Sequence, residues 1–359
     1  MTSFDIVQRR LYNQSIAPAA LEEPGDVVKR LGAAQAQDYL AALWAVGLRL
    51  NTATEQTIEQ AISDRRMVRT WPMRGTLHFV APEDVRWMLA LLTPRILARA
   101  AQRRKQLELD EAVFVRCETL FTKALQGGKQ LTRNQMMAVL EQNGISTAGQ
   151  RGYHILWWTA QNGLICFGPR QGKQDTFVLL DEWLPSGKSL SRDESLAELT
   201  HRYFTGHGPA TIQDFMWWSG LPAADARAGL EMVESQLARE ALDGQTYWFS
   251  PSLPAAKAAS PTAYLLPGFD EYLLGYKDRS AVLDPAHAAK VVPGANGIFK
   301  PIIVVDGRVA GIWKRTQRKT KVMVEFKPFT SLSPAQMEAA IIAAESYGRF
   351  LGLPVKISH

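Results

Sequence analysis

Between residues 130 and 180, hydrophobic positions change from helical spacing to strand spacing. Thr132 can cap the first helix of this segment, in which Met136 and Leu140 lie on one face. The predicted elements are helices over 133–142 and 150–161 and strands over 164–168 and 176–180. A polar turn joins the two strands, so the order is helix, turn, helix, strand, turn, strand. This order is typical of a winged helix-turn-helix.

The same order of elements recurs further along the chain. The predicted elements are helices over 194–204, 211–219 and 223–237 and a hairpin over 242–249. Asp243 and Gly244 supply the hairpin turn, because this dipeptide adopts the left-handed backbone that tight turns need. The repeat therefore predicts a second winged helix.

The N-terminal part can be interpreted as a third copy. The predicted elements are helices over 4–12, 24–31, 38–48 and 54–64, a hairpin over 67–80, and a long basic helix over 82–107. The three copies have the same order of elements but little similarity in sequence. The evidence for a repeat is therefore this order of elements.

The pattern changes after residue 250. A linker rich in Pro, Ala and Ser covers 251–261. Predicted strands follow over 262–266, 298–306, 308–313 and 322–326, with a closing helix over 333–351. We expect a small β-barrel or sheet domain here. The predicted fold class is α+β, with three tandem winged helix-turn-helix domains and a C-terminal β-barrel domain with its closing helix.

These patterns divide the chain into four parts. The first winged helix and its linker helix occupy 1–110, the second winged helix 111–185, the third 186–258, and the β-barrel with the closing helix 259–359. Tandem winged helices are typical of DNA-binding proteins, although such domains also dock other proteins.

Composition narrows the class of protein. Apolar residues make up 46% of the 359 residues, and no apolar run reaches the ~18 residues that cross a bilayer. The N-terminus lacks the layout of a signal peptide. Two cysteines exclude a disulfide framework and a cysteine-rich metal site. We therefore expect a cytoplasmic protein without a membrane partner.

Charge points to an acidic partner. The chain carries 41 Lys and Arg against 35 Asp and Glu, a net charge of +6, which a soluble protein can also carry by accident. The distribution says more, because basic residues cluster over 65–74, 95–105 and 314–321. The candidate DNA-binding residues are Arg65, Arg66, Arg69, Arg74, Lys314, Arg315, Arg318, Lys319 and Lys321. The last five form the tip of a predicted hairpin. Such a basic tip can contact DNA phosphates or insert into a groove. The alternative is a solvated turn without a binding role.

Two polar groups of residues are candidates for chemistry. Gln35 and Gln37 flank Ala36 just before an apolar helix, and in an extended backbone both amides point to the same side. The second group consists of Asp270, Glu271, Tyr272 and Arg279. It predicts either a buried polar network or part of a site. His78, in a predicted strand, is either a structural histidine or a supporting site residue. No phosphate-binding loop or metal spacing occurs, so we expect no cofactor and no metal.

Four motifs together resemble those of the AlkZ-like bacterial DNA glycosylases. They are Gln35-Ala36-Gln37, the segment from Thr70 to His78, the segment from Phe269 to Arg279, and the segment from Val305 to Trp313. The resemblance covers nearly the whole chain in the same order. It implies tandem winged helices with a basic DNA-binding face, and excision of N7-alkylated purines, including unhooking of interstrand crosslinks. Gln35 and Gln37 match the catalytic pair of the Gln-aliphatic-Gln branch, and the basic hairpin is similar to a DNA-inserting hairpin of that family.

The chemistry of an N7-alkylated purine explains how two glutamine amides could catalyse its excision without a charged side chain. N7-alkylation makes the purine cationic and hence a good leaving group, so strong acid catalysis is unnecessary. What remains is to hold a water beneath C1′ and to stabilise an oxocarbenium-like sugar. We expect Gln37 to position the water with help from Gln35. The expected substrate is double-stranded DNA that contains alkylated purines, and we expect the protein to be a monomer. No catalytic lysine is evident, so we expect a monofunctional enzyme. A non-catalytic regulator of transcription and a protein-docking scaffold are the alternatives.

Overall fold

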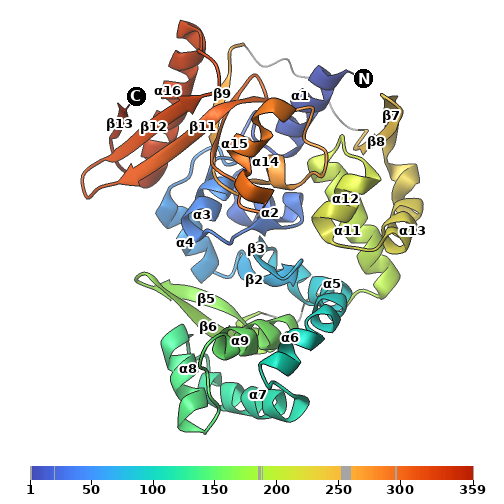
Figure 1. The fold of residues 1–359 in the computed structure, drawn as a ribbon, viewed down its shortest axis with the longest axis vertical. Coiled ribbons are helices and arrows are strands. Elements are labelled where there is room, and N and C mark those ends of the chain that lie inside the picture. The colour runs from blue at the N-terminus through green and yellow to red at the C-terminus, as the bar shows by residue number, and fades with distance from the viewer. Residues whose placement is uncertain are drawn as a thin grey trace. The chain divides into compact units, whose positions relative to one another are not determined.

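A computed structural model describes residues 2–19, 21–184, 187, 189–251, 260–295 and 297–358. Most of the predicted linker over 251–261 therefore lies outside the described residues. The chain divides into two compact units, residues 1–58 with 196–359, and residues 59–195. Figure 1 gives the labels of the elements. The four predicted parts are consecutive stretches of the sequence, whereas these two units are defined by contacts in space. The division into four parts therefore stays a prediction.

The unit of residues 59–195 contains the segment that the sequence pattern resolves most clearly. Its elements are β2 (Val68–Met73), β3 (Thr76–Val80), α5 (Val85–Arg99), α6 (Ala101–Gln106), α7 (Glu111–Leu125), β4 (Leu131–Thr132), α8 (Arg133–Gln142), α9 (Arg151–Gln161), β5 (Ile165–Gln171), β6 (Gln174–Leu179) and α10 (Leu180–Trp183). Thr132 and Gln135 cap α8 reciprocally, each side chain accepting a bond from the other residue's backbone N–H. Strand β6 lies between β4 and β5.

One apolar core holds this unit together. Phe121, Leu140, Ile155 and Phe177 from α7, α8, α9 and β6 are buried in it. The single long helix predicted over 82–107 is wrong, because a short 3-10 turn (Pro82–Asp84) precedes α5, which ends at Arg99, and α6 begins at Ala101. The exposed basic side chains of this region are therefore divided between α5 and α6.

The other unit begins with α1 (Ser3–Asn13), α2 (Pro24–Leu31), β1 (Ala34–Gln35) and α3 (Tyr39–Gly47), and α4 (Glu55–Ser63) includes the division between the units. After the second unit come α11 (Arg192–His207), α12 (Ile212–Ser219), α13 (Ala223–Val233), β7 (Ala238–Leu242) and β8 (Gln245–Phe249). Thr211 caps α12, and Gly220 ends it in the left-handed conformation. The predicted hairpin over 242–249 is confirmed, with β7 longer than expected.

The C-terminal strands form one sheet. The elements are β9 (Ala263–Leu266), α14 (Glu271–Leu274), α15 (Ala288–Val291), β10 (Ile302–Val305), β11 (Arg308–Gln317), β12 (Val322–Pro328), α16 (Pro334–Leu351) and β13 (Val355–Ser358). The order of strands is β13-β12-β11-β10-β9, so β13 and β9 are the outer strands of an open sheet in the described residues, and the expected closed barrel is not found. Helix α16 packs against this sheet (Figure 1).

Two boundaries in this sheet differ from the prediction for local reasons. The strand predicted over 298–306 begins only at Ile302, because Pro301 has no N–H to give to a ladder. Strand β11 continues to Gln317, so the turn moves to residues 318–321, where the N–H of Arg318 donates to the carbonyl of Lys321 at 2.9 Å. The terminal strand β13, parallel to β12, was not predicted.

Candidate active site and nucleic-acid interface

Gln35 and Gln37 lie on either side of the end of β1. Gln35 is 8% exposed, whereas Gln37 is exposed at the surface. The strand ends at Gln35, so the extended stretch is shorter than a strand through both glutamines. Asp38 follows as the cap of α3, its carboxylate accepting the N–H of Ala41 at 3.1 Å. The motif therefore joins a buried strand end to the start of a buried helix.

A buried carboxylate holds the backbone of Gln35. The N–H of Gln35 donates to Oε1 of Glu271 at 3.0 Å, and Nε1–H of Trp218 donates to Oε2 at 3.0 Å. Glu271 is 2% exposed and is the first residue of α14. Hydrogen bonds to a charged acceptor are stronger than neutral ones, particularly away from water. Glu271 therefore links the Gln35 strand to α12.

The neighbouring carboxylate, Asp270, pairs with Arg49. Both oxygens of Asp270 accept from the guanidinium at 2.9 Å, and both side chains are 1% exposed. The remaining N–H groups of Arg49 donate to Gln14 and to the carbonyl of Ala45. Asp270 therefore binds the C-terminal end of the segment that runs from Gln35 to Arg49.

The other two predicted members of this group have structural contacts elsewhere. The hydroxyl of Tyr272 donates to the carbonyl of Gly307 at 2.6 Å. Arg279 donates from Nε to the carbonyl of Leu273 at 2.8 Å, and its guanidinium lies over the ring of Trp217. Burial lowers the pKa of Arg279. Asp270 and Glu271 are thus brought to the segment that carries the glutamines, and Tyr272 and Arg279 make other contacts.

His207 is a buried neighbour of Glu271 that the sequence analysis missed. Its ring stacks on Tyr203 with centroids 4.8 Å apart, and Nε2 lies 3.5 Å from Oε2 of Glu271. Burial lowers the pKa of His207, although Glu271 acts against this shift. The aromatic cluster of Tyr203 and Trp218 therefore surrounds a neutral imidazole.

Trp218 and Arg49 were missed as well. Arg49 interrupts an otherwise apolar stretch, and Asp270 and Glu271 lie among apolar residues far along the chain. Opposite charges in two apolar surroundings are a signal for a buried pair. Their pairing could have been suspected from this signal, but nothing in the spacing identifies the partner.

The arginines predicted in residues 65–74 differ in their surroundings. Arg65 and Arg66 are exposed, and the guanidinium of Arg65 lies over the ring of Trp183. Arg69 is 5% exposed and pairs with Asp175 at 3.1 Å. Arg69 is thus part of the packing of its unit.

Arg74 and His78 lie together in the β2–β3 hairpin. Nη2 of Arg74 is 3.2 Å from Nε2 of His78, and Nδ1 of His78 is 2.9 Å from the carbonyl of Thr76. These distances fit a neutral ring that donates from Nδ1 and accepts at Nε2. His78 is fully buried, and its ring lies between the carbonyl of Thr76 and the guanidinium of Arg74.

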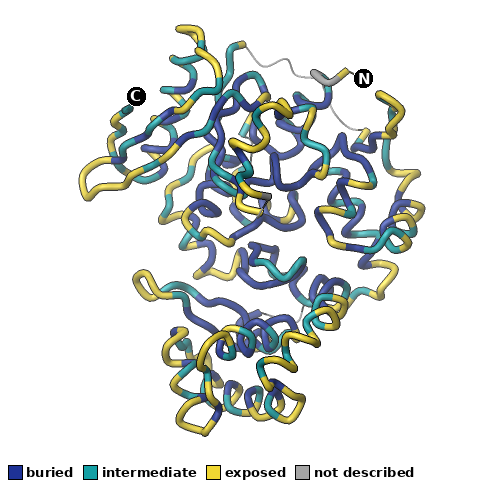
Figure 2. Tube along the Cα trace, viewed as in Figure 1, coloured by how far each residue is buried: buried dark blue, intermediate teal, exposed yellow. Residues whose placement is uncertain are grey.

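The basic hairpin between β11 and β12 is exposed at its tip, as Figure 2 shows in yellow. Lys314, Arg318, Lys319 and Lys321 are exposed. Arg315 differs, because its guanidinium donates to the hydroxyl of Tyr347 on α16 at 2.6 Å. Four of the five predicted basic residues are therefore accessible to an anion.

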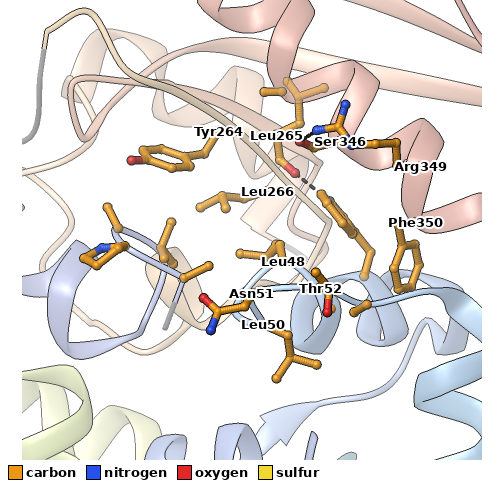
Figure 3. A pocket seen from close by; sticks show the side chains of 18 of the residues that line it. Leu48, Leu50, Asn51, Thr52, Tyr264, Leu265, Leu266, Ser346, Arg349 and Phe350 are labelled. Carbon is orange, nitrogen blue, oxygen red and sulfur yellow. Dashed lines mark hydrogen bonds between the residues drawn. The ribbon is translucent and has the colours of Figure 1, made fainter. Parts of the chain in front are cut away.

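A large cavity lies away from the predicted site residues. It has a volume of about 1010 Å³ and largely apolar walls that include Trp44. Figure 3 shows Leu50, Tyr264 and Phe350 among its other lining residues. Nε1–H of Trp44 donates to the carbonyl of Leu265 at its edge. None of the described residues that line it is a predicted site residue. Gln35 and Gln37 therefore do not line this cavity.

In the part of the chain that the structure describes, no group of three or more His, Cys, Asp or Glu is arranged to hold a metal ion. Of the described helices, none is both long and apolar enough to span a membrane.

Comparisons with known proteins agree over the length of the chain. The family model "DNA glycosylase AlkZ-like" matches residues 28–350. A protein of Streptomyces sahachiroi described as an interstrand DNA cross-link repair glycosylase is 28% identical over an aligned length of 374 residues. The alignment covers 97% of this chain and 97% of that protein. The solved structure of the Streptomyces sahachiroi DNA glycosylase AlkZ matches with a TM-score of 0.82 and 25% identity, covering 100% of both chains. The mixed α and β fold is therefore that of the solved structure.

Proposed function

Because the chain belongs to the AlkZ-like DNA glycosylase family and is thus a hydrolase of N-glycosyl bonds, we propose that it excises N7-alkylated purines from duplex DNA. We propose that Gln37 positions the attacking water and that Gln35 assists it. The observation that carries this assignment is the pairing of an exposed Gln37 with a Gln35 whose backbone a buried carboxylate holds at 3.0 Å.

The amides suit a substrate that already carries a positive charge. Each amide offers one carbonyl acceptor and two N–H donors, so two of them hold a water from two directions. The cationic purine leaves without strong protonation, and the positioned water captures the oxocarbenium-like sugar at C1′. Neutral bases such as uracil lack this advantage, so we expect little activity on them.

Interstrand crosslinks are the second substrate that we propose. The Streptomyces sahachiroi relative is described as a cross-link repair glycosylase, and it is matched over 97% of both chains. A base tethered to the opposite strand cannot be flipped fully out of the duplex, so the enzyme must meet it in place. The exposure of Gln37 supports such an open site.

Contacts with the DNA backbone fall to the exposed basic residues. We propose that Arg65, Arg66 and the hairpin tip bind phosphates, with Arg74 held by His78 as a further contact. We also infer three winged helices, because the order helix, strand, two helices and hairpin occurs twice in the described elements. The segment from α11 to β8 repeats this order with an isolated bridge at Ala210 in place of the strand. The protein works as a monomer at the bacterial nucleoid under this proposal.

Base release tests the proposal directly. Duplex DNA containing N7-methylguanine is incubated with wild type, with Gln35→Ala, with Gln37→Ala and with the surface control Gln126→Ala, and the free base is measured. We expect release by wild type and by the control, a loss of roughly hundredfold in Gln37→Ala and a smaller loss in Gln35→Ala. Unchanged release in both motif variants overturns the assigned roles.

The same samples separate the remaining possibilities. A DNA crosslinked by a nitrogen mustard tests unhooking, and intact strands after release confirm a monofunctional enzyme. Binding without any release at high protein concentration indicates the non-catalytic regulator instead. Absence of salt-sensitive DNA binding indicates a protein-docking scaffold.

A further inference from the structure

Two consecutive carboxylates hold both ends of the segment that carries the glutamines. Glu271 accepts the N–H of Gln35, where the segment begins, and Asp270 binds the guanidinium of Arg49, where it ends. Helix α3 lies between these two points. Because both carboxylates stand at the start of α14, the segment is fastened at both ends to one short element.

Glu271 is itself fixed in place. Its side chain is 2% exposed, and its second oxygen accepts Nε1–H of Trp218 at 3.0 Å. The hydroxyl of Tyr203 donates to the carbonyl of Gly275 at 2.8 Å, just beyond α14. A Cβ on Gly275 would lie 2.7 Å from Cδ2 of His207, so the end of α14 packs directly on the imidazole. Glu271 therefore has little freedom to follow a shift of Gln35.

The bond from Glu271 acts on the backbone, where it affects both glutamines. It fixes the amide plane that precedes Cα of Gln35, so it sets the direction in which that side chain leaves the backbone. Gln37 follows two residues later, directly before the cap of α3. Errors of about 1 Å in a catalytic group can cost on the order of a hundredfold in rate.

We propose that Glu271 is a positioning residue for the two glutamines, which it serves by holding the backbone N–H of Gln35 against the Trp218 cluster. The proposal rests on the proposed function, because it assigns Glu271 to the same site. Under this proposal, the segment from Phe269 to Arg279 contributes to catalysis through Glu271 without contacting DNA.

Glu271→Gln gives a sharp test because it preserves size and removes one acceptor. Both oxygens of Glu271 face an N–H donor, so the new NH₂ group must oppose either Gln35 or Trp218. We expect the single-turnover rate of N7-methylguanine release to fall roughly tenfold to hundredfold, with the affinity for duplex DNA within about twofold of wild type.

A second substitution relieves this conflict. Trp218→Phe removes the indole donor, so in the double variant the NH₂ group can face position 218 while the oxygen keeps its bond with Gln35. We expect the double variant to release base at least roughly threefold faster than Glu271→Gln alone. A merely structural role predicts the opposite, because truncating buried Trp218 removes packing and adds to the loss.

The matched control is another buried carboxylate of the same unit. Asp214 is fully buried and accepts the N–H groups of Lys277 and Asp278 at 2.9 and 3.0 Å. We expect Asp214→Asn to lower the melting temperature and leave the release rate of the folded protein within about twofold of wild type. An equal loss of rate in Asp214→Asn and Glu271→Gln overturns the proposal, as does an unchanged rate in Glu271→Gln or a double variant slower than Glu271→Gln.

Amide hydrogen exchange separates this proposal from the proposed function. The N–H of Gln35 should exchange slowly in wild type, faster in Glu271→Gln and slowly again in the double variant. This measurement needs no substrate. If wild type releases no base, the proposed function fails while the exchange still reports on the bond. Equal exchange in wild type and Glu271→Gln overturns the positioning role even when release is observed.

Discussion

Arg49 and Asp270 form a buried bidentate ion pair between residues 221 positions apart in the chain. Both N···O distances are 2.9 Å, and each side chain is 1% exposed. The other Arg49 donors are bound by Gln14 and Ala45, so the guanidinium is satisfied on all sides. The pair ties the C-terminal end of α3 to the start of α14, next to the residue that holds Gln35.

Removing one partner of this pair should be costly. In Asp270→Asn the Arg49 charge stays buried without its counter-charge, so we expect the free energy of unfolding in urea to fall by about 3 kcal/mol or more. The double variant Arg49→Met with Asp270→Leu removes both charges and should recover a large part of this stability. A stability of Asp270→Asn equal to that of wild type would contradict the role assigned to the pair.

Arg66 and Arg69 are close in sequence but should respond differently to substitution. Arg69 is buried against Asp175 at 3.1 Å, and its guanidinium lies 4.7 Å from the centre of the Phe167 ring. We expect Arg69→Ala to lower the melting temperature by several degrees because it removes this ion pair and the packing on Phe167. Arg66 is exposed, so Arg66→Ala should weaken DNA binding without a change in melting temperature. The reverse pattern would refute the distinction.

The exposed tip of the β11–β12 hairpin should contribute to the salt dependence of DNA binding. Each bound phosphate releases counterions, so the slope of log K against log salt changes by about 0.9 for every phosphate that the protein neutralises. We therefore expect Lys319→Ala and Lys321→Ala each to make the slope shallower by about this amount, measured by fluorescence anisotropy over a range of salt concentrations.

Lys327 supplies the control for this measurement. It lies on β12 away from the tip and pairs with Glu325 at 3.0 Å. Lys327→Ala should leave the slope unchanged. Equal slopes for wild type and the two tip variants would remove the hairpin from the DNA-binding surface.

The sequence predicted best those elements whose ends are marked locally. Helix α8 begins after Thr132 and ends at Gln142, as predicted, because its capping box and the following Asn143-Gly144 lie within the segment itself. Helix α2 was predicted over the same residues, Pro24–Leu31, and it begins with a proline at its first position and ends at Gly32. In both cases the relevant interactions join residues a few positions apart.

The arrangement of the strands depended on interactions that the local pattern does not contain. An open sheet and a closed barrel require the same alternating strands, and pairing at the edges decides between them. Strand β13 adds to the edge in parallel with β12 after α16, an arrangement that alternation alone does not reveal. The site shows the same limit, because Gln35 and Glu271 were both singled out but are 236 positions apart.

His207 should make stability depend on pH. Burial lowers its pKa below the ordinary value of 6.5, against the opposing effect of Glu271 and with the help of Arg49 and Arg10. Below pH 6.5 the unfolded chain therefore binds a proton at this histidine that the folded protein resists. The free energy of unfolding that His207 contributes is present above pH 6.5 and is lost as the pH falls towards the folded pKa.

A variant without the imidazole isolates this effect. His207→Phe keeps a ring to stack on Tyr203 and has no proton to bind. We expect the difference in unfolding free energy between wild type and His207→Phe to shift against wild type between pH 7 and pH 5, measured by urea unfolding at each pH. His154, whose pKa is also lowered by burial, is present in both proteins, so its contribution cancels. A difference that stays constant over this range would mean that His207 has the same pKa in the folded and unfolded protein.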